Sequence, residues 1–116
     1  MTEPFITSTL LEEDSSLIDL IDKFISRLPA MRDDIVKAHD DGDWETFSKL
    51  IHQLKGVGGN YGYPELSELC ANIEAHLSEE KLEEVSNQLT EFKRMAEKIL
   101  AGNEENHKIA EKFNSR

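Results

Sequence analysis

A histidine and a lysine lie three positions apart in the segment ETFSKLIHQLKGVGGNYG, residues 45–62. On a helix this spacing places Lys55 about one turn from His52, on the same side. A neutral imidazole nitrogen can attack an activated phosphoryl group and hold it as a phosphoramidate, and a nearby ammonium group can stabilise the phosphoryl charge. The pattern therefore predicts a nucleophilic histidine at a phosphoryl-transfer site. The residues within about 60° of His52 around the helix axis are Ser48, Lys55, Gly56 and Gly59.

Glycine is unusually frequent directly after the histidine. Residues 56, 58 and 59 are all glycine, and each costs about 1 kcal/mol relative to alanine in a helix interior. Such a cost indicates that another molecule or a neighbouring helix approaches the backbone closely. We assign Gly56 and Gly59 to clearance around His52 for a docking partner. Gly58 lies nearer the apolar side of the helix, where close helix packing is the simpler explanation.

The elements that position these residues have the apolar periodicity of helices. Trp44, Phe47, Ile51 and Leu54 form one stripe, and similar stripes follow over residues 64–77 and 80–100. Residues 17–28 carry a wider apolar band, after which Pro29 predicts a kink or break. We expect an all-α fold: an antiparallel up-down-up-down four-helix bundle with an extra N-terminal helix broken at Pro29.

The chain of 116 residues has the size of one domain. We expect residues 1–13 to form an N-terminal tail docked in part on the bundle, residues 14–101 to form the bundle, and residues 102–116 to form a polar C-terminal extension. Gly42 and Asp43 fit a helix end followed by a helix N-cap.

The composition excludes several classes of function. A formal net charge of −11 argues against binding to nucleic acid or to anionic membranes, since both depend on basic patches. The single cysteine, Cys70, cannot form an internal disulfide or a zinc cluster. The first residues lack the basic region and cleavage site of a signal peptide. We therefore expect a cytoplasmic protein without a metal or cofactor of its own.

The run His52-Gln53-Leu54-Lys55-Gly56 resembles the signature of histidine-containing phosphotransfer (HPt) domains. In that signature a small residue follows at the sixth position after the histidine and a glycine at the tenth, here Gly58 and Gly62. The resemblance covers about residues 10–101 and implies the four-helix bundle of that family. The clearest departure is the glycine richness, since Gly58 and Gly59 stand where alanine or serine is commoner.

The resemblance implies that His52 accepts a phosphoryl group on Nε2 and that Lys55 contacts the phosphoryl oxygens. It implies two partners, the receiver domains of a hybrid sensor kinase and of a response regulator, between which a monomer would shuttle phosphate. The domain would not be an enzyme with kinase activity of its own, because Mg²⁺ and the catalytic carboxylates belong to the receiver. The expected docking surface comprises Gln53, Ser48, Lys49, Leu17, Ile18 and Ile21.

Other interpretations remain. The chain would instead be a non-catalytic helical interaction module if its apolar first helix binds a partner and His52 is incidental. The glycine run fails the G-x-G-x-x-G pattern of a phosphate loop by one position. His39 stands among aspartates as metal ligands do, but its place at a helix end favours dipole and capping roles.

Overall fold

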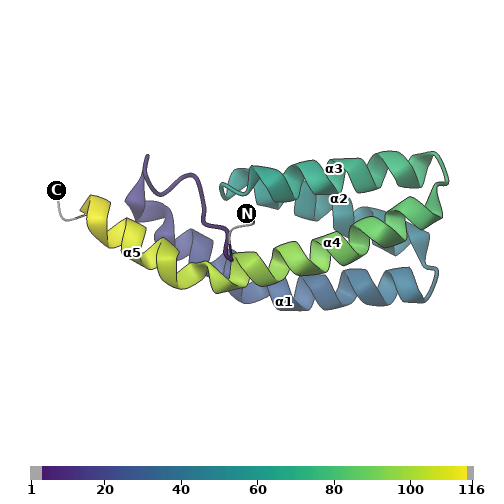
Figure 1. Ribbon diagram of the computed structural model, residues 1–116, viewed down its shortest axis with the longest axis horizontal. Helices are drawn as coiled ribbons and strands as arrows, with labels where there is room; N and C mark the ends of the chain where they lie inside the picture. The colour runs from purple at the N-terminus through teal and green to yellow at the C-terminus, as the bar shows by residue number, and fades with distance from the viewer. Residues whose placement is uncertain (1–3, 115–116) are drawn as a thin grey trace.

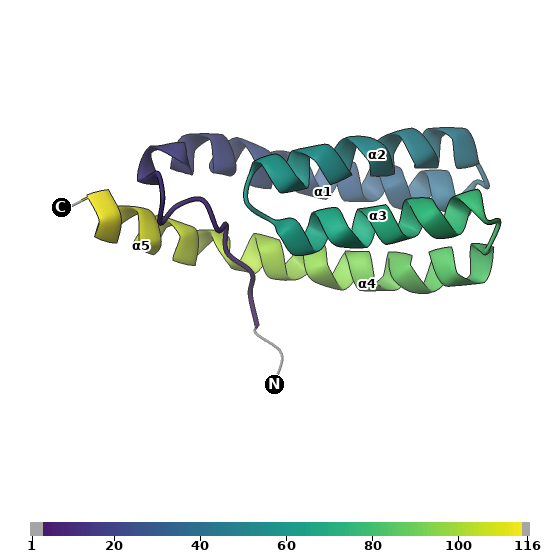
Figure 2. The same ribbon diagram turned by 90° about the horizontal axis from the view of Figure 1, so that it is seen from above.

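The computed structural model describes residues 4–114, and these residues form helices and short connections (Figure 1). The helices are the 3₁₀ helix η1 (Ser15–Leu17) and the α-helices α1 (Ile18–Asp40), α2 (Trp44–Asn60), α3 (Pro64–Ser78), α4 (Leu82–Ala101) and α5 (Asn103–Asn114). Among the first four α-helices each packs against two of the other three, in the order α1–α2, α2–α3, α3–α4 and α4–α1. Seen from above, they run antiparallel with short turns at either end (Figure 2). The predicted all-α bundle is thus confirmed.

The first long helix continues through Pro29, so the predicted break into two helices is wrong. α1 extends from Ile18 to Asp40 with the proline inside it. Proline has no N–H to donate, and its ring disfavours the turn before it. Leu28 directly before the proline and Ile35 after it are both fully buried. Packing of both halves against one core therefore outweighs the local penalty.

The turn between α1 and α2 follows the predicted capping pattern. Gly42 has a φ of +68°, in the left-handed region that glycine adopts without steric cost. The Asp43 carboxylate accepts a 3.2 Å hydrogen bond from the Thr46 backbone N–H, which satisfies one free donor at the start of α2. The start of the histidine-bearing helix is thereby fixed.

The core fills the space between the four long helices. On α2, Phe47, Ile51 and Leu54 are fully buried, while Trp44 packs partly buried at the end. The facing residues of α3 are buried as well: Leu66, Leu69, Cys70 and Ile73. Burial of these stripes fixes which side of α2 faces solvent.

The N-terminal segment before η1 is docked on the bundle. The Ile6 N–H donates to the Lys98 carbonyl of α4 at 3.0 Å, and the Thr9 N–H donates to the Gly62 carbonyl at 2.9 Å. Leu11 is fully buried in the core. Figure 2 shows this segment crossing the bundle near the junction of α4 and α5.

The additional helix of this protein lies at the C-terminus. α5 begins directly after α4 and lies beside η1 and the start of α1 (Figure 1). Its buried Asn106 accepts a 2.9 Å hydrogen bond from the Ser8 N–H and donates a 3.0 Å bond to the Tyr63 hydroxyl. These bonds tie α5 to the N-terminal segment and to Tyr63, the N-cap residue of α3. None of the described helices has both the length and the apolar character needed to cross a bilayer.

Candidate functional site

His52 projects from the solvent side of α2. It directly follows the buried Ile51, so it lies at the edge of the apolar stripe. Its side chain is 71% exposed. The position that the sequence predicted for a nucleophile is therefore accessible to a partner.

A carboxylate from the neighbouring helix binds both predicted site residues. Glu74 of α3 places Oε2 3.0 Å from Nδ1 of His52 and Oε1 2.6 Å from Nζ of Lys55. The Glu74 and Lys55 side chains are partly shielded, with 26% and 34% of their surface exposed. The site is therefore a histidine and a lysine from one helix, bridged by a glutamate from the next.

This bridge fixes the charge of Glu74 and the tautomer of His52. Although burial acts to raise it, contacts with Lys55 and His52 hold the pKa of the Glu74 carboxyl below its ordinary value. An ionised carboxylate only accepts hydrogen bonds, so Nδ1 of the histidine must carry the proton that is donated. In the neutral ring the lone pair then lies on Nε2. A pre-oriented nucleophilic nitrogen results.

The glycines near the site serve different purposes. A Cβ at Gly56 would meet nothing within 4 Å, whereas one at Gly58 would come within 3.1 Å of the Leu66 side chain. The packing role predicted for Gly58 is thus confirmed, and Gly56 leaves open space beside the histidine. Gly59 is exposed, and a Cβ there would make an ordinary 3.5 Å contact with Ser67.

Gly62 has a role that the sequence did not reveal. Its φ is +85°, and a Cβ would collide with the Ser8 hydroxyl and lie 2.9 Å from the Thr9 nitrogen. Only glycine lets the N-terminal segment pass this close to the α2–α3 turn. The glycine at the tenth position after His52 thereby connects the histidine helix to that segment.

Gln53 lies beside the histidine and lines a groove between α1 and α2. This groove has a volume of about 330 Å³. Its apolar lining comes from both helices: Phe24, Met31, Ile35, Leu50, Val57 and Tyr61. Lys23, Arg27 and Asp34 line it as well. The groove therefore combines apolar surface with two cations and one carboxylate.

The start of α1 is less accessible than the sequence suggested. Ile21 is fully buried, so its predicted place on the docking surface is wrong. Leu17 and Ile18 are half-buried against the core, and η1 lies beside α5. The wide apolar band is explained in part by the C-terminal helix that it packs against, a tertiary contact that periodicity does not reveal.

The two remaining docking candidates lie on α2 before the histidine. Ser48 is half-buried one turn from His52, and Lys49 is exposed. The Lys49 ammonium lies 3.3 Å from the Glu45 carboxylate. Lys49 therefore pairs with a carboxylate of its own helix, whereas Lys55 pairs with Glu74 of α3 at the site.

Glu74 is the site residue that sequence reasoning missed. It follows the buried Ile73 of α3 as His52 follows the buried Ile51 of α2. Each therefore lies at the solvent edge of its helix stripe, and the edges of adjacent helices can meet. These matching positions are the sequence signal that could have pointed to Glu74. The contact with His52 can be inferred from them only once the register of α2 against α3 is known.

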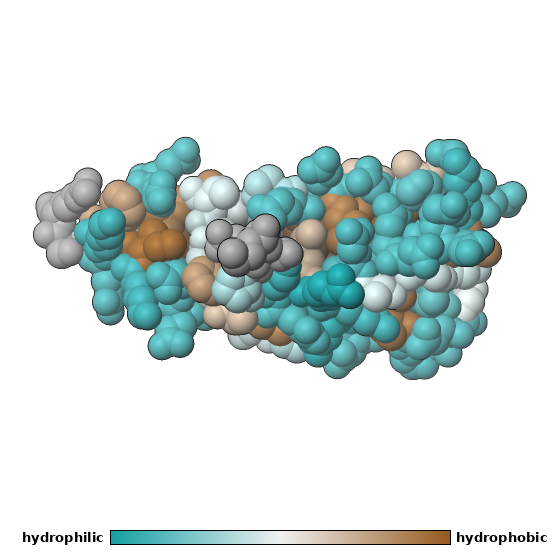
Figure 3. Space-filling model, in the orientation of Figure 1, coloured by the Kyte–Doolittle hydropathy of each residue, from teal (hydrophilic) through white to brown (hydrophobic). Residues whose placement is uncertain are grey.

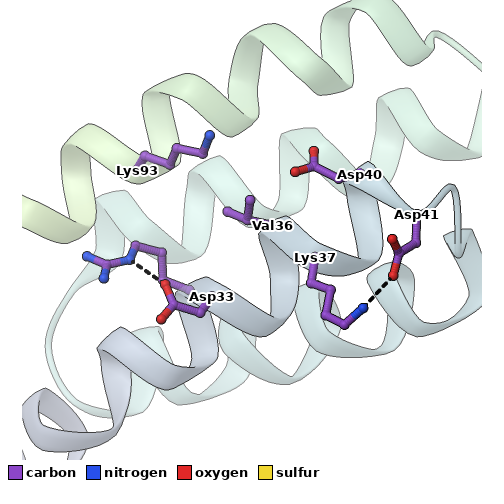
Figure 4. Close-up of a pocket in the computed structure, with 7 residues that line it drawn as sticks. Asp33, Val36, Lys37, Asp40, Asp41 and Lys93 are labelled. Carbon is purple, nitrogen blue, oxygen red and sulfur yellow. Dashed lines mark hydrogen bonds and ion pairs between the residues drawn. The ribbon is translucent and has the colours of Figure 1, made fainter.

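Other charged hollows on the surface lack such an arrangement. Between α1 and α4, Arg32 lies 3.3 Å from Asp33 and Lys37 lies 2.8 Å from Asp41, so these charges are neutralised locally (Figure 4). His39 contacts Asp40 and the Ser86 hydroxyl, at 3.0 and 2.9 Å. Within residues 4–114, no group of three or more His, Cys, Asp or Glu side chains is placed to hold a metal ion.

The family of this chain follows from a match to a family model over most of the bundle. The family model described as Hpt domain matches residues 19–102. This chain is an Hpt domain. Members of the family carry phosphoryl groups on histidine in phosphorelays and interact with receiver domains. No curated protein and no solved structure gives a significant match to the chain.

Proposed function

We propose that this Hpt domain accepts a phosphoryl group from the aspartyl phosphate of a receiver domain onto His52. It then passes the group to an aspartate of another receiver. The observation that carries the proposal is the contact between Nδ1 of His52 and the Glu74 carboxylate, which leaves Nε2 of an exposed ring free to react.

The transfer step follows from that arrangement. The Nε2 lone pair attacks phosphorus, the N–P bond forms, and the bond from phosphorus to the aspartyl oxygen breaks, which releases a carboxylate on the receiver. The proton stays on Nδ1, so the ring gains positive charge as the bond forms. The Glu74 carboxylate stabilises that charge by accepting the Nδ1–H bond. Return of the phosphoryl group to a carboxylate reverses each change.

Lys55 acts on the transferred phosphoryl group and not on the imidazole ring. Its ammonium has three N–H donors, and it forms an ion pair with Oε1 of Glu74. An ammonium paired through one direction keeps N–H donors for the phosphoryl oxygens on Nε2. Glu74 is therefore a positioning residue for both neighbours, and Lys55 contacts the transferred group.

The groove between α1 and α2 is the surface that we assign to receiver docking. It adjoins the site through Gln53 and offers apolar side chains with Lys23 and Arg27 at its edge. A receiver's phosphorylation pocket is acidic, so these cations suit it. Gly56 and Gly59 give the receiver access to His52, and Ser48 and Lys49 border the same side. The partners would be the receivers of a hybrid sensor kinase and of a response regulator, bound by a monomer.

The proposal is tested by transfer from a radiolabelled, phosphorylated receiver domain. The wild-type chain should take up an acid-labile, base-stable label, and His52→Gln should take up none while its circular dichroism stays helical. His107→Gln, which changes an exposed histidine on α5, is the matched control and should be labelled normally. Label that persists in His52→Gln contradicts the proposal.

A further inference from the structure

An apolar hollow lies at the end of the bundle remote from α5, where the α1–α2 and α3–α4 turns meet. It has a volume of about 570 Å³. Its lining comes from three helices and one turn: Trp44, Glu45, Leu77, Glu80 and Leu82. In Figure 3 hydrophilic side chains dominate that end of the molecule, with hydrophobic surface visible between them. We propose that this hollow binds a basic segment of a partner protein that carries an apolar side chain between lysines or arginines.

The apolar part of the hollow is held in place by the core. The Trp44 ring meets the rings of His39 and Phe47 edge to face, with centroids 5.6 Å from each. Leu77 packs against the core, whereas Leu82 is 41% exposed. A tryptophan held by the core beside an exposed leucine is the kind of surface on which burial of a partner's apolar side chain contributes most to binding.

The charges around the hollow define the chemistry of the occupant. Glu79 lies 3.0 Å from Lys81 and Glu45 lies 3.3 Å from Lys49, so two carboxylates have partners. Glu80, which lines the hollow, has no ion pair among residues 4–114. Glu83 and Glu84 follow in the first turn of α4 and add negative charge near it, with Glu84 attracted to Lys81. The surplus of negative charge favours a cationic segment and opposes a second copy of this acidic chain.

The α3–α4 turn combines a hydrogen-bonded backbone, in which the Lys81 N–H donates to the His76 carbonyl at 2.9 Å, with residue types that do not favour it. Glu80 has a φ of +59°, where glycine would be free of strain. Lys81 at the N-cap of α4 makes no side-chain capping bond. Leu82, the first residue of that helix, leaves apolar surface in water. The positive φ of Glu80 and the exposure of Leu82 favour a surface used by a partner, and the hollow and its charge carry the proposal.

This surface is separate from the phosphoryl-transfer site. Trp44 precedes His52 by eight residues on α2, about 12 Å along the helix axis. A short segment bound at the hollow therefore lies about two helical turns from His52. The proposal does not depend on the function of His52, and its test needs no phosphorylated protein.

The tryptophan is the only one in the chain, so its fluorescence reports directly on the hollow. The full chain is titrated with a short synthetic peptide of alternating leucine and lysine. Binding should shift Trp44 emission to shorter wavelength, because the indole loses contact with water. Leu82→Ser should weaken binding roughly tenfold. Leu20→Ser is the matched control, since Leu20 is an equally exposed leucine (43%) on α1, and it should leave the affinity unchanged.

A second variant separates binding from folding. Glu80→Gly removes a carboxylate at the hollow and the strain of the positive φ. It should weaken peptide binding roughly threefold while raising the midpoint of thermal unfolding. A peptide with glutamate in place of lysine should not bind. Equal affinity of the lysine peptide for the wild type and both variants would overturn the proposal, because neither the exposed leucine nor the carboxylate of the hollow would then take part in binding. Dimerisation in sedimentation equilibrium that Leu82→Ser abolishes would also overturn it, by assigning the hollow to a second copy.

Discussion

The carboxylate of Glu74 on α3 lies 3.0 Å from Nδ1 of His52 on α2. The group that orients the histidine therefore comes from a different helix and is 22 residues away in the sequence. The same carboxylate reaches Lys55 at 2.6 Å, so one side chain sets the tautomer of the ring and the position of the ammonium. The site works as a unit that depends on the packing of α2 against α3.

Glu74→Ala should slow phosphoryl transfer to His52 roughly tenfold, the lower end of the loss seen when a group that orients a ligating or reacting histidine is removed. The ring then loses its fixed tautomer and the anion that stabilises its positive charge. Nitrogen NMR of His52 should show the Nδ1–H form in the wild type and a mixture of tautomers in the variant. Glu74→Gln still accepts the hydrogen bond and should lose less activity than Glu74→Ala. Equal rates in all three proteins would exclude a positioning role.

Acidification should lower the free energy of unfolding, because Glu74 becomes protonated. Its pKa is lowered in the folded protein, so its contribution to the free energy of unfolding is complete above the ordinary value of 4.5. The contribution is lost as pH falls through the lowered pKa. In Lys55→Ala the pKa of Glu74 should move up toward 4.5. The decrease in the free energy of unfolding that protonation of Glu74 causes should then be smaller. Carboxyl NMR titration of Glu74 measures this shift directly, and an unchanged pKa would contradict the bridge.

Gly62→Ala and Gly56→Ala should change stability in opposite directions. Alanine at residue 62 meets a positive φ and the N-terminal segment, and should lower the free energy of unfolding by about 1–3 kcal/mol. Alanine at residue 56 faces open space on a helix and should raise it by about 0.5–1 kcal/mol. Chemical denaturation measures both. A stabilising Gly62→Ala would show that Ser8 and Thr9 do not dock as described.

Gly56→Leu should block transfer from a receiver while the chain stays folded. The added side chain enters the open space beside His52 that a docked receiver would use. Phosphorylation by a small-molecule donor, phosphoramidate, should be affected much less, because that donor needs no docking surface. Normal transfer from the receiver would contradict the clearance assigned to Gly56.

Asn106→Ala should loosen α5 and the N-terminal segment together. The change leaves the buried Ser8 N–H without its acceptor and removes a donor to Tyr63. Loss of such buried partners costs about 1–3 kcal/mol. Hydrogen exchange should accelerate in α5 and in the backbone around Ile6 and Thr9, whereas Asn87→Ala, at an exposed position of α4, should have no such effect.

The sequence predicted those parts of the site that depend on one helix. His52, Lys55 and Gly56 share a side of α2, and helical periodicity alone places them together. Glu74 required the register between two helices, which periodicity does not contain. The docking role of Ile21 was wrong for a related reason, since the burial of that residue depends on how the start of α1 packs in the assembled fold.

The fold shows the same division between local and tertiary effects. The stripe of Phe47, Ile51 and Leu54 predicted the buried side of α2 correctly. At Pro29 the local rule predicted a break, but packing on both sides keeps α1 continuous. The C-terminal extension has few apolar residues, of which Ala110 and Ile109 pack on the core. α5 is also anchored by a buried polar side chain, Asn106, which an apolar pattern does not reveal.

The most direct test of the central claim is the atom that carries phosphate after transfer from a receiver. Two-dimensional NMR that correlates phosphorus with the ring nitrogens of isotopically labelled protein distinguishes the two positions. We predict coupling of phosphorus to Nε2 of His52, with Nδ1 still protonated and bonded to Glu74. Phosphate on Nδ1, or on any residue other than His52, would contradict the account.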